Sequence, residues 1–417
     1  MAKINTKVTD SVNFFQGNDP KELVKNYGSP LYVYNERILR ERCRDIKNLV
    51  TYPHFSVNYS TKANNNLAFL EIVHDEGLNV DAMSPGEAHV EMMAGFKPEQ
   101  IFFISNNVSE EEMQYAIDHN IILSVDSLSQ LEQYGRLNRG GKVAARFNGG
   151  VGAGHHEKVV TAGKKTKFAI NPEYIPEFKE ILKKYDLKLV GINQHIGSLF
   201  MDGDKYIEGV KAVLEIAKQF EDLEFVDLGG GFGIPYEKLN DQPRLDLKAL
   251  GEKLSKILFD FAKEYGKEIT FKVEPGRYIS AECSVLLGTV HAIKQNNVHK
   301  FAGTDLGFNV LARPMMYDSH HDIEVYNDSD ETEEITVVGN ICESGDIIAH
   351  DRVMPKVKEG DIIGVLDAGA YGFSMASNYN NRLRPAEVLI RENGEVVIIR
   401  KRDTFEDLTR NMISLKN

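Results

Sequence analysis

Four features of this sequence stand directly after apolar, β-branched runs, and together they could hold one small molecule. The glycine-rich turn GGGFG at 229–233 and Gly276 would let backbone N–H groups approach an anion such as phosphate. Lys62 supplies an amine that could form an imine, Glu274 could face a protonated ring nitrogen, and His195 could stack on a flat ring. A phosphate, an amine-reactive aldehyde and a pyridinium together describe pyridoxal 5′-phosphate (PLP).

Each residue of this set also has an ordinary structural explanation. A lysine after a strand is commonly a solvated surface residue, and glycines often serve turns alone. Glu274 could pair with Arg277, and His195 could be a hydrogen-bonded core histidine. Ser84 precedes Pro-Gly-Glu, which is the pattern of a helix N-cap. The cofactor interpretation therefore depends on whether the chain brings the four features to one place.

The elements that must position these residues follow a repeating strand-then-helix pattern. Eight apolar, β-branched runs begin near Phe55, Leu78, Ile101, Ile121, Val143, Leu189, Phe225 and Thr270. Most are separated by stretches with helical spacing of apolar residues, as between 202 and 220. Eight such units in about 230 residues predict a (β/α)8 TIM-type barrel, whereas an open doubly wound sheet is more typical of about five to seven strands. In such a barrel the residues that follow the strands meet at one mouth.

A second, β-rich domain is expected after about residue 285, because helical periodicity stops there and short extended runs follow. Asn393-Gly394 lies between two such runs and predicts a hairpin. The run LYVY at 31–34 could pair into the same domain. We therefore expect an α/β chain with a barrel over 40–285 and a discontinuous β domain, a sandwich or barrel, over 1–39 and 286–417.

Composition narrows the classes of partner and location. The 417 residues hold 49 Lys and Arg against 62 Asp and Glu, a net charge of −13, which disfavours nucleic acid and anionic membranes as partners. No apolar run is long enough to span a membrane, and the N-terminus lacks the apolar core of a signal peptide, so we expect a cytoplasmic protein. The few, widely spaced cysteines suit a reducing compartment: Cys43, Cys283 and Cys342.

Two other polar features are expected to be structural. The acidic stretch 327–334 is interpreted as a solvated loop. The pairs His155-His156 and His320-His321 lack a metal-ligand spacing, so no metal site is expected.

The sequence resembles the fold-type III PLP decarboxylases over nearly its whole length, and most closely the members that act on diaminopimelate. The motifs that carry the resemblance are YSTKAN at 59–64, HIGS at 195–198, DLGGGFGIPY at 227–236, EPGRYI at 274–279, CESGD at 342–346 and AYGFSMASNYNNRLRPAEVL at 370–389. The resemblance implies PLP as cofactor. Lys62 would bind its aldehyde, His195 would stack on its ring, and Glu274 would keep the ring nitrogen protonated. The other residues implied at the cofactor are Asp81, Ser198, Gly230, Gly231, Gly276, Arg277 and, through its hydroxyl, Tyr371.

The resemblance also implies how substrate would be held. Arg277, Arg313 and Tyr317 would hold its carboxylates, because arginine suits bidentate pairing, and Tyr371 would also line the substrate site. The reaction implied is decarboxylation of meso-2,6-diaminopimelate to L-lysine and CO2, the last step of lysine biosynthesis. The charged ring would act as the electron sink.

A homodimer with shared active sites is a further implication. In the family, the residues matching Cys342 and Glu343 reach the active site of the other subunit. Glu343 would contact the amino group at the reacting D-centre. Either Cys342 or Lys62 would return the proton.

Some positions depart from the family pattern, close to the expected site. Ala169 stands where the family usually has glycine, and NQHIGSLF at 193–200 replaces the commoner HxHIGSQ. The segment 304–322 also differs from its usual form, although Arg313 and Tyr317 remain. These differences bear on substrate choice rather than on the type of reaction.

Three alternatives stay open on the sequence. A decarboxylase of D-ornithine or D-lysine shares the scaffold, but a substrate without a distal carboxylate would leave an arginine unpaired. An amino-acid racemase typically places arginine at the ring nitrogen, where Glu274 is expected here. A non-catalytic cofactor-binding protein can lack the lysine or the β domain, both of which this sequence has.

Overall fold

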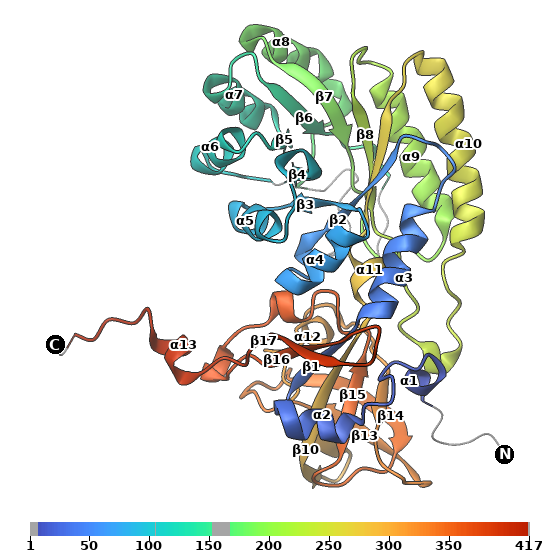
Figure 1. The fold of residues 1–417 in the computed structure, drawn as a ribbon, viewed down its shortest axis with the longest axis vertical. Helices are drawn as coiled ribbons and strands as arrows, with labels where there is room; N and C mark the ends of the chain where they lie inside the picture. The colour runs from blue at the N-terminus through green and yellow to red at the C-terminus, as the bar shows by residue number, and fades with distance from the viewer. Residues whose placement is uncertain (1–6, 105, 152–166, 416–417) are drawn as a thin grey trace. The chain divides into compact units, whose positions relative to one another are not determined.

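The computed structural model describes residues 7–104, 106–151 and 167–415. The chain divides into two compact units, which we call the barrel unit and the β unit (Figure 1). The barrel unit comprises Arg40–Ile234 and Arg244–Ile279, and the β unit comprises the described part of Met1–Leu39, Pro235–Pro243 and Ser280–Asn417. The expected domain ranges, 40–285 and 1–39 with 286–417, differ from these units at 235–243 and at 280–285, which belong to the β unit.

Eight parallel strands form the closed barrel, as the sequence predicts. They are β2 (Phe55–Ser60), β3 (Asn79–Ala82), β4 (Ile101–Ile104), β5 (Ile122–Val125), β6 (Lys142–Arg146), β7 (Lys188–Asn193), β8 (Phe225–Gly230) and β9 (Thr270–Glu274). Pairing of β2 with β9 closes the ring. Inside it, a packed cluster contains Phe102, Ile104, Ala144, Val190 and Phe225.

The helices of the barrel unit lie around these strands (Figure 1). They are the C-terminal part of α3 (Glu36–Lys47), α4 (Leu67–Asp75), α5 (Pro85–Met93), α6 (Glu110–Asp118), α7 (Leu128–Leu137), α8 (Ile175–Tyr185), α9 (Gly203–Ala217) and α10 (Leu247–Tyr265). Their ends follow the sequence signals. Ser84 caps α5 by accepting from the Glu87 amide (3.2 Å), and Gly266 ends α10 with a left-handed φ of 75°.

A nine-stranded mixed sheet forms the β unit. Its strands are β1 (Leu31–Asn35), β10 (Ser284–Gln295), β11 (Lys300–Thr304), β12 (Ile323–Val325), β13 (Thr332–Val338), β14 (Ile347–Pro355), β15 (Ile362–Leu366), β16 (Ala386–Ile390) and β17 (Val396–Arg400). β1 pairs antiparallel with β10 and parallel with β16, so the predicted insertion of the run at 31–34 is confirmed. The hairpin β16–β17 turns at Gly394 (φ 84°), as predicted.

The prediction of a loop over the acidic stretch 327–334 is wrong for the last three of these residues. Thr332–Glu334 begin β13 and pair with Val353–Pro355 of β14. Glu333 forms an ion pair with Lys300 of the neighbouring β11, which offsets the charge that suggested a loop. Composition alone does not distinguish a charged strand from a charged loop.

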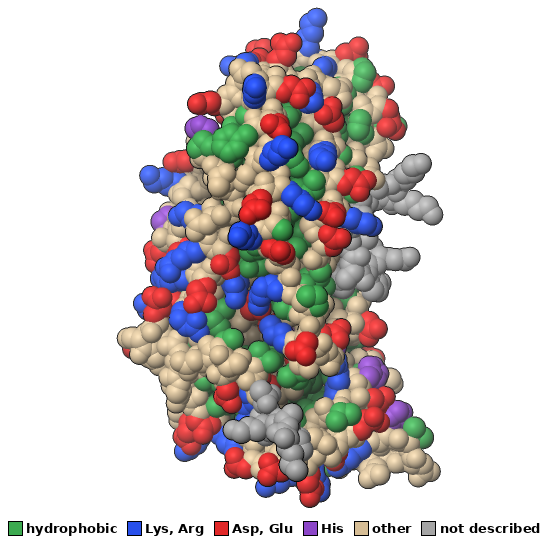
Figure 2. Space-filling view, turned by 90° about the vertical axis from the view of Figure 1, so that its right-hand side faces the viewer, with side chains coloured by type: hydrophobic (Ala, Val, Ile, Leu, Met, Phe, Trp, Pro, Cys, Tyr) green, Lys and Arg blue, Asp and Glu red, His purple; other side chains and the backbone are tan. Residues whose placement is uncertain are grey.

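The surface agrees with the charge composition. Figure 2 shows Lys and Arg side chains interspersed with Asp and Glu side chains over the visible face. Within the described ranges, no helix is long and apolar enough to cross a membrane, and no group of three or more His, Cys, Asp or Glu could hold a metal. His155-His156 lies outside those ranges.

Candidate active site

Lys62 lies at the C-terminal end of β2, in the single 3₁₀ turn η1 (Thr61–Ala63). Its neighbours Thr61 and Ala63 are fully buried, so the turn is fixed in the barrel wall. The Tyr59 hydroxyl donates to the carbonyl of Asn64 (3.0 Å) and holds the far side of the turn. The predicted amine therefore stands on a rigid support at the mouth of the barrel.

Asp81, on the neighbouring strand β3, belongs to the same charged cluster. It is fully buried, and the Ser60 hydroxyl donates to its Oδ2 atom (2.6 Å). Burial raises the pKa of Asp81 to about 7, although the Lys62 charge and the Ser60 hydrogen bond act in the opposite direction. The structure thus brings Lys62 and Asp81 within electrostatic reach of each other.

Glu274 ends β9 and is buried. Among the described residues its Oε1 atom has no hydrogen-bond partner. Burial raises its pKa well above the usual range, and the carboxylates of Asp227 and Asp81 add to the rise. The cations Lys62 and Arg146 oppose it. Because a buried carboxylate is costly, a cation placed against the Oε1 atom of Glu274 would be stabilised.

His195 follows β7, and the backbone of the next loop fixes its ring. The Gly230 amide donates to His195 Nδ1 (3.3 Å), so Nδ1 carries no proton. Desolvation lowers the pKa of His195 well below its usual value, helped by the charges of Lys62 and Arg146. The imidazole is therefore neutral. Since the Gly230 amide is already engaged, its role in this structure is to orient His195.

The glycine turn at 229–231 packs backbone against backbone. A Cβ on Gly230 would stand 1.8 Å from the carbonyl oxygen of Glu274, and one on Gly231 would stand 2.4 Å from that of Gly197. Gly231 also has a left-handed φ of 104°. Side chains cannot occupy these positions. The Gly229 amide donates to Asp227 Oδ1 (2.9 Å) and the Gly230 amide to His195, so an anion bound at this turn would be met by the Gly231 amide.

Arg277 joins the loops after β7 and β9. It begins α11 (Arg277–Ser280) and is buried, with Nη2 donating to Ser198 Oγ (3.0 Å). The buried Gly276 precedes it. Seven predicted residues beside Lys62 and Asp81 therefore meet at the mouth of one barrel: His195, Ser198, Gly230, Gly231, Glu274, Gly276 and Arg277.

Three ionisable residues of this region were not among the predicted site residues. Arg146 ends β6, and its guanidinium lies 4.8 Å from the centre of the Phe168 ring. Asp227 is fully buried on β8. Because Arg146 and Asp227 lie at or near the ends of barrel strands, the strand pattern could have indicated both as site residues. Glu91 is fully buried on α5, three residues after the buried Ala88, and this helical spacing was the available signal.

Arg313 and Tyr317 begin and end α12 (Arg313–Tyr317) in the β unit. Arg313 is only 1% exposed and donates to His321 Nε2 (2.8 Å) and Ser319 Oγ (3.3 Å). Its guanidinium also lies over the ring of Tyr236 (4.7 Å). These contacts hold the guanidinium plane in a single orientation.

Tyr371 lies in a tight turn after β15 and adopts a left-handed φ of 56°. Glycines on both sides make the turn possible. A Cβ on Gly369 would stand 1.9 Å from the Ser280 carbonyl oxygen, and one on Gly372 would stand 2.2 Å from that of Ala368. A bulky residue in this conformation costs about 1–2 kcal/mol, and such strain is concentrated at binding and catalytic sites.

Cys342 and Glu343 are exposed in the loop between β13 and β14. Cys43 and Cys283 are buried. The predicted residues of the β unit thus occupy three places: α12, the turn after β15, and this exposed loop.

Comparisons with known proteins point to one family. The model of the family described as pyridoxal-dependent decarboxylase, pyridoxal binding domain, matches residues 36–281. Diaminopimelate decarboxylase of Methanothermobacter thermautotrophicus is 42% identical over 405 residues, which cover 94% of each chain. The same enzyme of Archaeoglobus fulgidus is 37% identical, with 96% of each chain covered.

A solved structure agrees in fold along nearly the whole chain. Diaminopimelate decarboxylase from Helicobacter pylori, crystallised with L-lysine, superposes with a TM-score of 0.86 at 32% identity. The match covers 94% of this chain and 98% of that one.

Proposed function

This chain belongs to the diaminopimelate decarboxylases, and we propose that it releases the carboxylate at the D-centre of meso-2,6-diaminopimelate as CO2, leaving L-lysine. The observation that carries the proposal is the buried Glu274 carboxyl, whose Oε1 atom has no hydrogen-bond partner in the described part of the chain, in the same charged cluster as the Lys62 amine. The Glu274 carboxyl suits a protonated pyridine nitrogen, and the Lys62 amine suits an aldehyde. Pyridoxal, which the matching family model names, has both groups.

The residues at the barrel mouth fit PLP. Glu274 would face the ring nitrogen, and the neutral His195 would offer a flat surface to the ring. The Gly231 amide would meet the phosphate group, together with Ser198 and Gly276. Bound PLP supplies an electron sink for the electron pair that remains when CO2 departs. The remaining cofactor contacts of the proposal come from Asp81, Arg277 and Tyr371.

The protein's own groups do three things in this scheme. Lys62 would hold the cofactor through its Nζ atom and could afterwards move a proton with the same amine. Glu274 would keep the ring nitrogen protonated, because burial makes its carboxylate costly and a further cation beside it would stabilise that charge. Either Lys62 or the thiol of Cys342 returns a proton to the reacting carbon.

Substrate recognition rests on fixed guanidinium groups. Arg313 is held by His321 and Ser319, so little side-chain entropy is lost when it pairs with a carboxylate. Arg277 and Tyr317 complete the proposed carboxylate contacts. A substrate with a distal carboxylate uses these groups, whereas D-ornithine or D-lysine would leave a buried arginine uncompensated.

The exposed positions of Cys342 and Glu343 support a homodimer in which each subunit completes the site of the other. In this proposal Glu343 contacts the amino group at the reacting D-centre. The cytoplasm is the proposed location, because the three cysteines are all free thiols.

One assay tests the proposed function. Purified protein with added PLP is offered meso-diaminopimelate, L-lysine, D-lysine and ornithine separately, and CO2 release is measured together with the chirality of the product. Release from diaminopimelate alone, with L-lysine as product, supports the proposal. Release only from D-lysine or D-ornithine, or racemisation without CO2, contradicts it.

A further inference from the structure

The loop that carries Cys342 and Glu343 has a firm base and an exposed tip. At the base, the buried Asp346 accepts from the amides of Ile341 (2.7 Å) and Phe308 (2.6 Å). Cys342, Glu343 and the two residues after them are all exposed. Asp346 alone therefore does not determine how the tip is held.

A second segment of the β unit, residues 378–382, contacts this tip directly. The Cys342 amide donates to Asn380 Oδ1 (2.9 Å), and the Tyr379 hydroxyl donates to Glu343 Oε1 (2.7 Å). Arg382 Nη2 donates to the carbonyl oxygen of Asn340 (3.1 Å). Three residues of one short segment thus bind the loop at three points. These points are the Asn340 carbonyl, the Cys342 amide and the Glu343 carboxylate.

The shape of the 378–382 segment explains why it can do this. Asn380 and Asn381 have left-handed φ values of 55° and 52°, which asparagine tolerates better than most residues. This reversal sends the side chains of Tyr379 and Asn380 toward the loop. The Tyr379 ring also packs on Phe308, with ring centres 5.7 Å apart.

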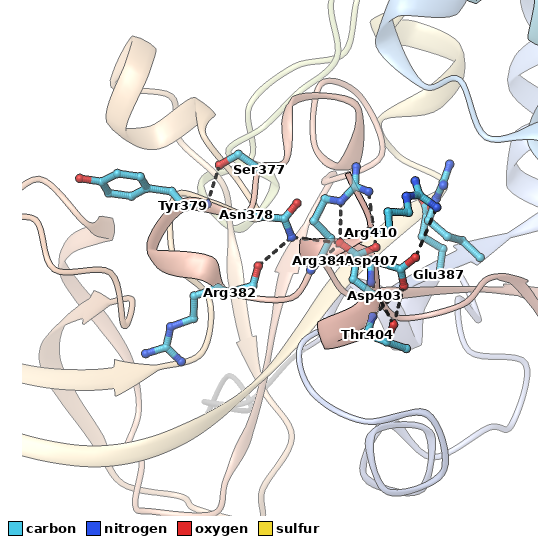
Figure 3. Close-up of polar contacts among 11 residues, drawn as sticks. Ser377, Asn378, Tyr379, Arg382, Arg384, Glu387, Asp403, Thr404, Asp407 and Arg410 are labelled. Carbon is cyan, nitrogen blue, oxygen red and sulfur yellow. Dashed lines mark hydrogen bonds and ion pairs between the residues drawn. The ribbon is translucent and has the colours of Figure 1, made fainter. Parts of the chain in front are cut away.

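The segment is itself anchored to the C-terminal part of the chain (Figure 3). Asn378 Nδ2 donates to the Arg382 carbonyl (2.8 Å) and to Asp403 Oδ2 (3.0 Å). Asp403 also forms an ion pair with Arg384 (2.8 Å). The 378–382 segment is therefore fixed at both ends, independently of the loop that it contacts.

We propose that Tyr379 and Asn380 are positioning residues of the decarboxylase. Tyr379 sets the orientation of the Glu343 carboxylate, and Asn380 fixes the backbone from which the Cys342 thiol projects into the active site of a second copy of the chain. The proposal rests on the proposed function, and in particular on the action of this loop across a dimer. Without these contacts the loop would have to become ordered whenever it acts on substrate, at a cost in side-chain and backbone entropy.

Tyr379→Phe tests the contact to Glu343. It removes one hydrogen bond to a charged group, so we expect kcat/KM for meso-diaminopimelate to fall about five- to twentyfold, mainly through a higher KM. Tyr185→Phe is the matched control, because the Tyr185 hydroxyl donates to the Glu132 carboxylate over the same 2.7 Å, away from the barrel mouth. Kinetics within about twofold of wild type for Tyr379→Phe would overturn the role of Tyr379.

Asn380→Gly tests the contact to Cys342. Glycine keeps the left-handed backbone but removes the acceptor, so we expect kcat to fall more than KM changes, with unaltered absorbance of bound PLP. Asn380→Asp retains the acceptor and should restore most of the rate. Asn120→Gly, at an exposed left-handed position on the barrel unit, is the control. No loss in Asn380→Gly, or no rescue by aspartate, would overturn the role of Asn380.

Heterodimers separate this proposal from the function on which it rests. A Lys62→Ala copy paired with a Cys342→Ala copy keeps one intact site if sites are shared, giving about half the wild-type rate. A Lys62→Ala copy paired with an Asn380→Gly copy should reach the same rate, because the intact site takes its loop from the first copy. An inactive first pair contradicts the shared site itself. An active first pair beside a second pair that is slowed as far as the Asn380→Gly homodimer overturns the positioning proposal alone.

Discussion

A buried acid on α5 gives the sharpest test of the electrostatics of the barrel unit. Glu91 is 0% exposed, and a hydrogen bond from the Thr61 hydroxyl only partly offsets the cost of burying its carboxyl group. Burial raises its pKa from 4.5 to about 8, and the carboxylates of Asp81 and Glu87 contribute to the rise. Glu91 is therefore protonated in the folded protein at neutral pH and ionised in the unfolded chain.

The sign and size of the effect follow from this difference. Between pH 4.5 and about 8 the folded state keeps a proton that the unfolded state has lost, so stability falls as pH rises. The fall is about 1.4 kcal/mol per pH unit, and it reaches about 5 kcal/mol once the pH exceeds the folded pKa. Glu91→Gln keeps the shape of the side chain but cannot ionise. Its stability relative to wild type should therefore rise steadily across this interval.

Thermal unfolding of both proteins from pH 5 to pH 8.5 measures the effect. For a unit of this size each kcal/mol moves Tm by about 2–4 °C, so the advantage of Glu91→Gln should be small at pH 5 and about 10–20 °C at pH 8.5. Glu111→Gln, at an exposed position on α6, should show no such trend. A difference between Glu91→Gln and wild type that does not change with pH would refute the reasoning.

Three further outcomes are expected. Ala169 has a left-handed φ of 73°, so Ala169→Gly should relieve strain and stabilise the protein by about 1 kcal/mol, seen as a rise in Tm; a lower Tm would contradict this. Lys238 pairs with two buried carboxylates, Asp367 (2.5 Å) and Glu282 (3.3 Å), so Lys238→Met should destabilise the β unit by about 3–5 kcal/mol in chemical denaturation, and a neutral result would show that the pair is solvated. Tyr371→Phe should weaken PLP binding about tenfold in an absorbance titration, and unchanged affinity would exclude its hydroxyl from the phosphate site.

Much of the fold could be predicted from the sequence because each strand of the barrel is a short, continuous apolar run. Strands buried on both faces need such runs, and the eight runs coincide with β2–β9. The pairing of 31–34 with β10 and β16 was also expected. By contrast, the place of 235–243 in the β unit depends on contacts such as Lys238 with Asp367, which are 129 residues apart in the chain.

The candidate site also contains residues that the sequence pattern could predict and residues that it could not. Lys62, Glu274 and His195 follow strands, so topology alone brought them together. The contact of Tyr379 with Glu343 depends on packing between segments that no local pattern connects, whereas the burial of Glu91 had only the helical spacing from Ala88 as a signal. The hydrogen bond from the Gly230 amide to His195 could not be predicted either, because the spacing of residues does not show which backbone donors already have an acceptor.

The central claim is that Lys62 is the amine on which the chemistry depends, and decarboxylation of meso-diaminopimelate by Lys62→Ala tests it most directly. The matched control is Lys188→Ala, because Lys188 is an exposed lysine at the opposite end of a barrel strand. We predict that wild type and Lys188→Ala release CO2 at the same rate, whereas Lys62→Ala loses at least about a thousandfold in kcat. Retention of activity in Lys62→Ala, with the control unchanged, would contradict the account.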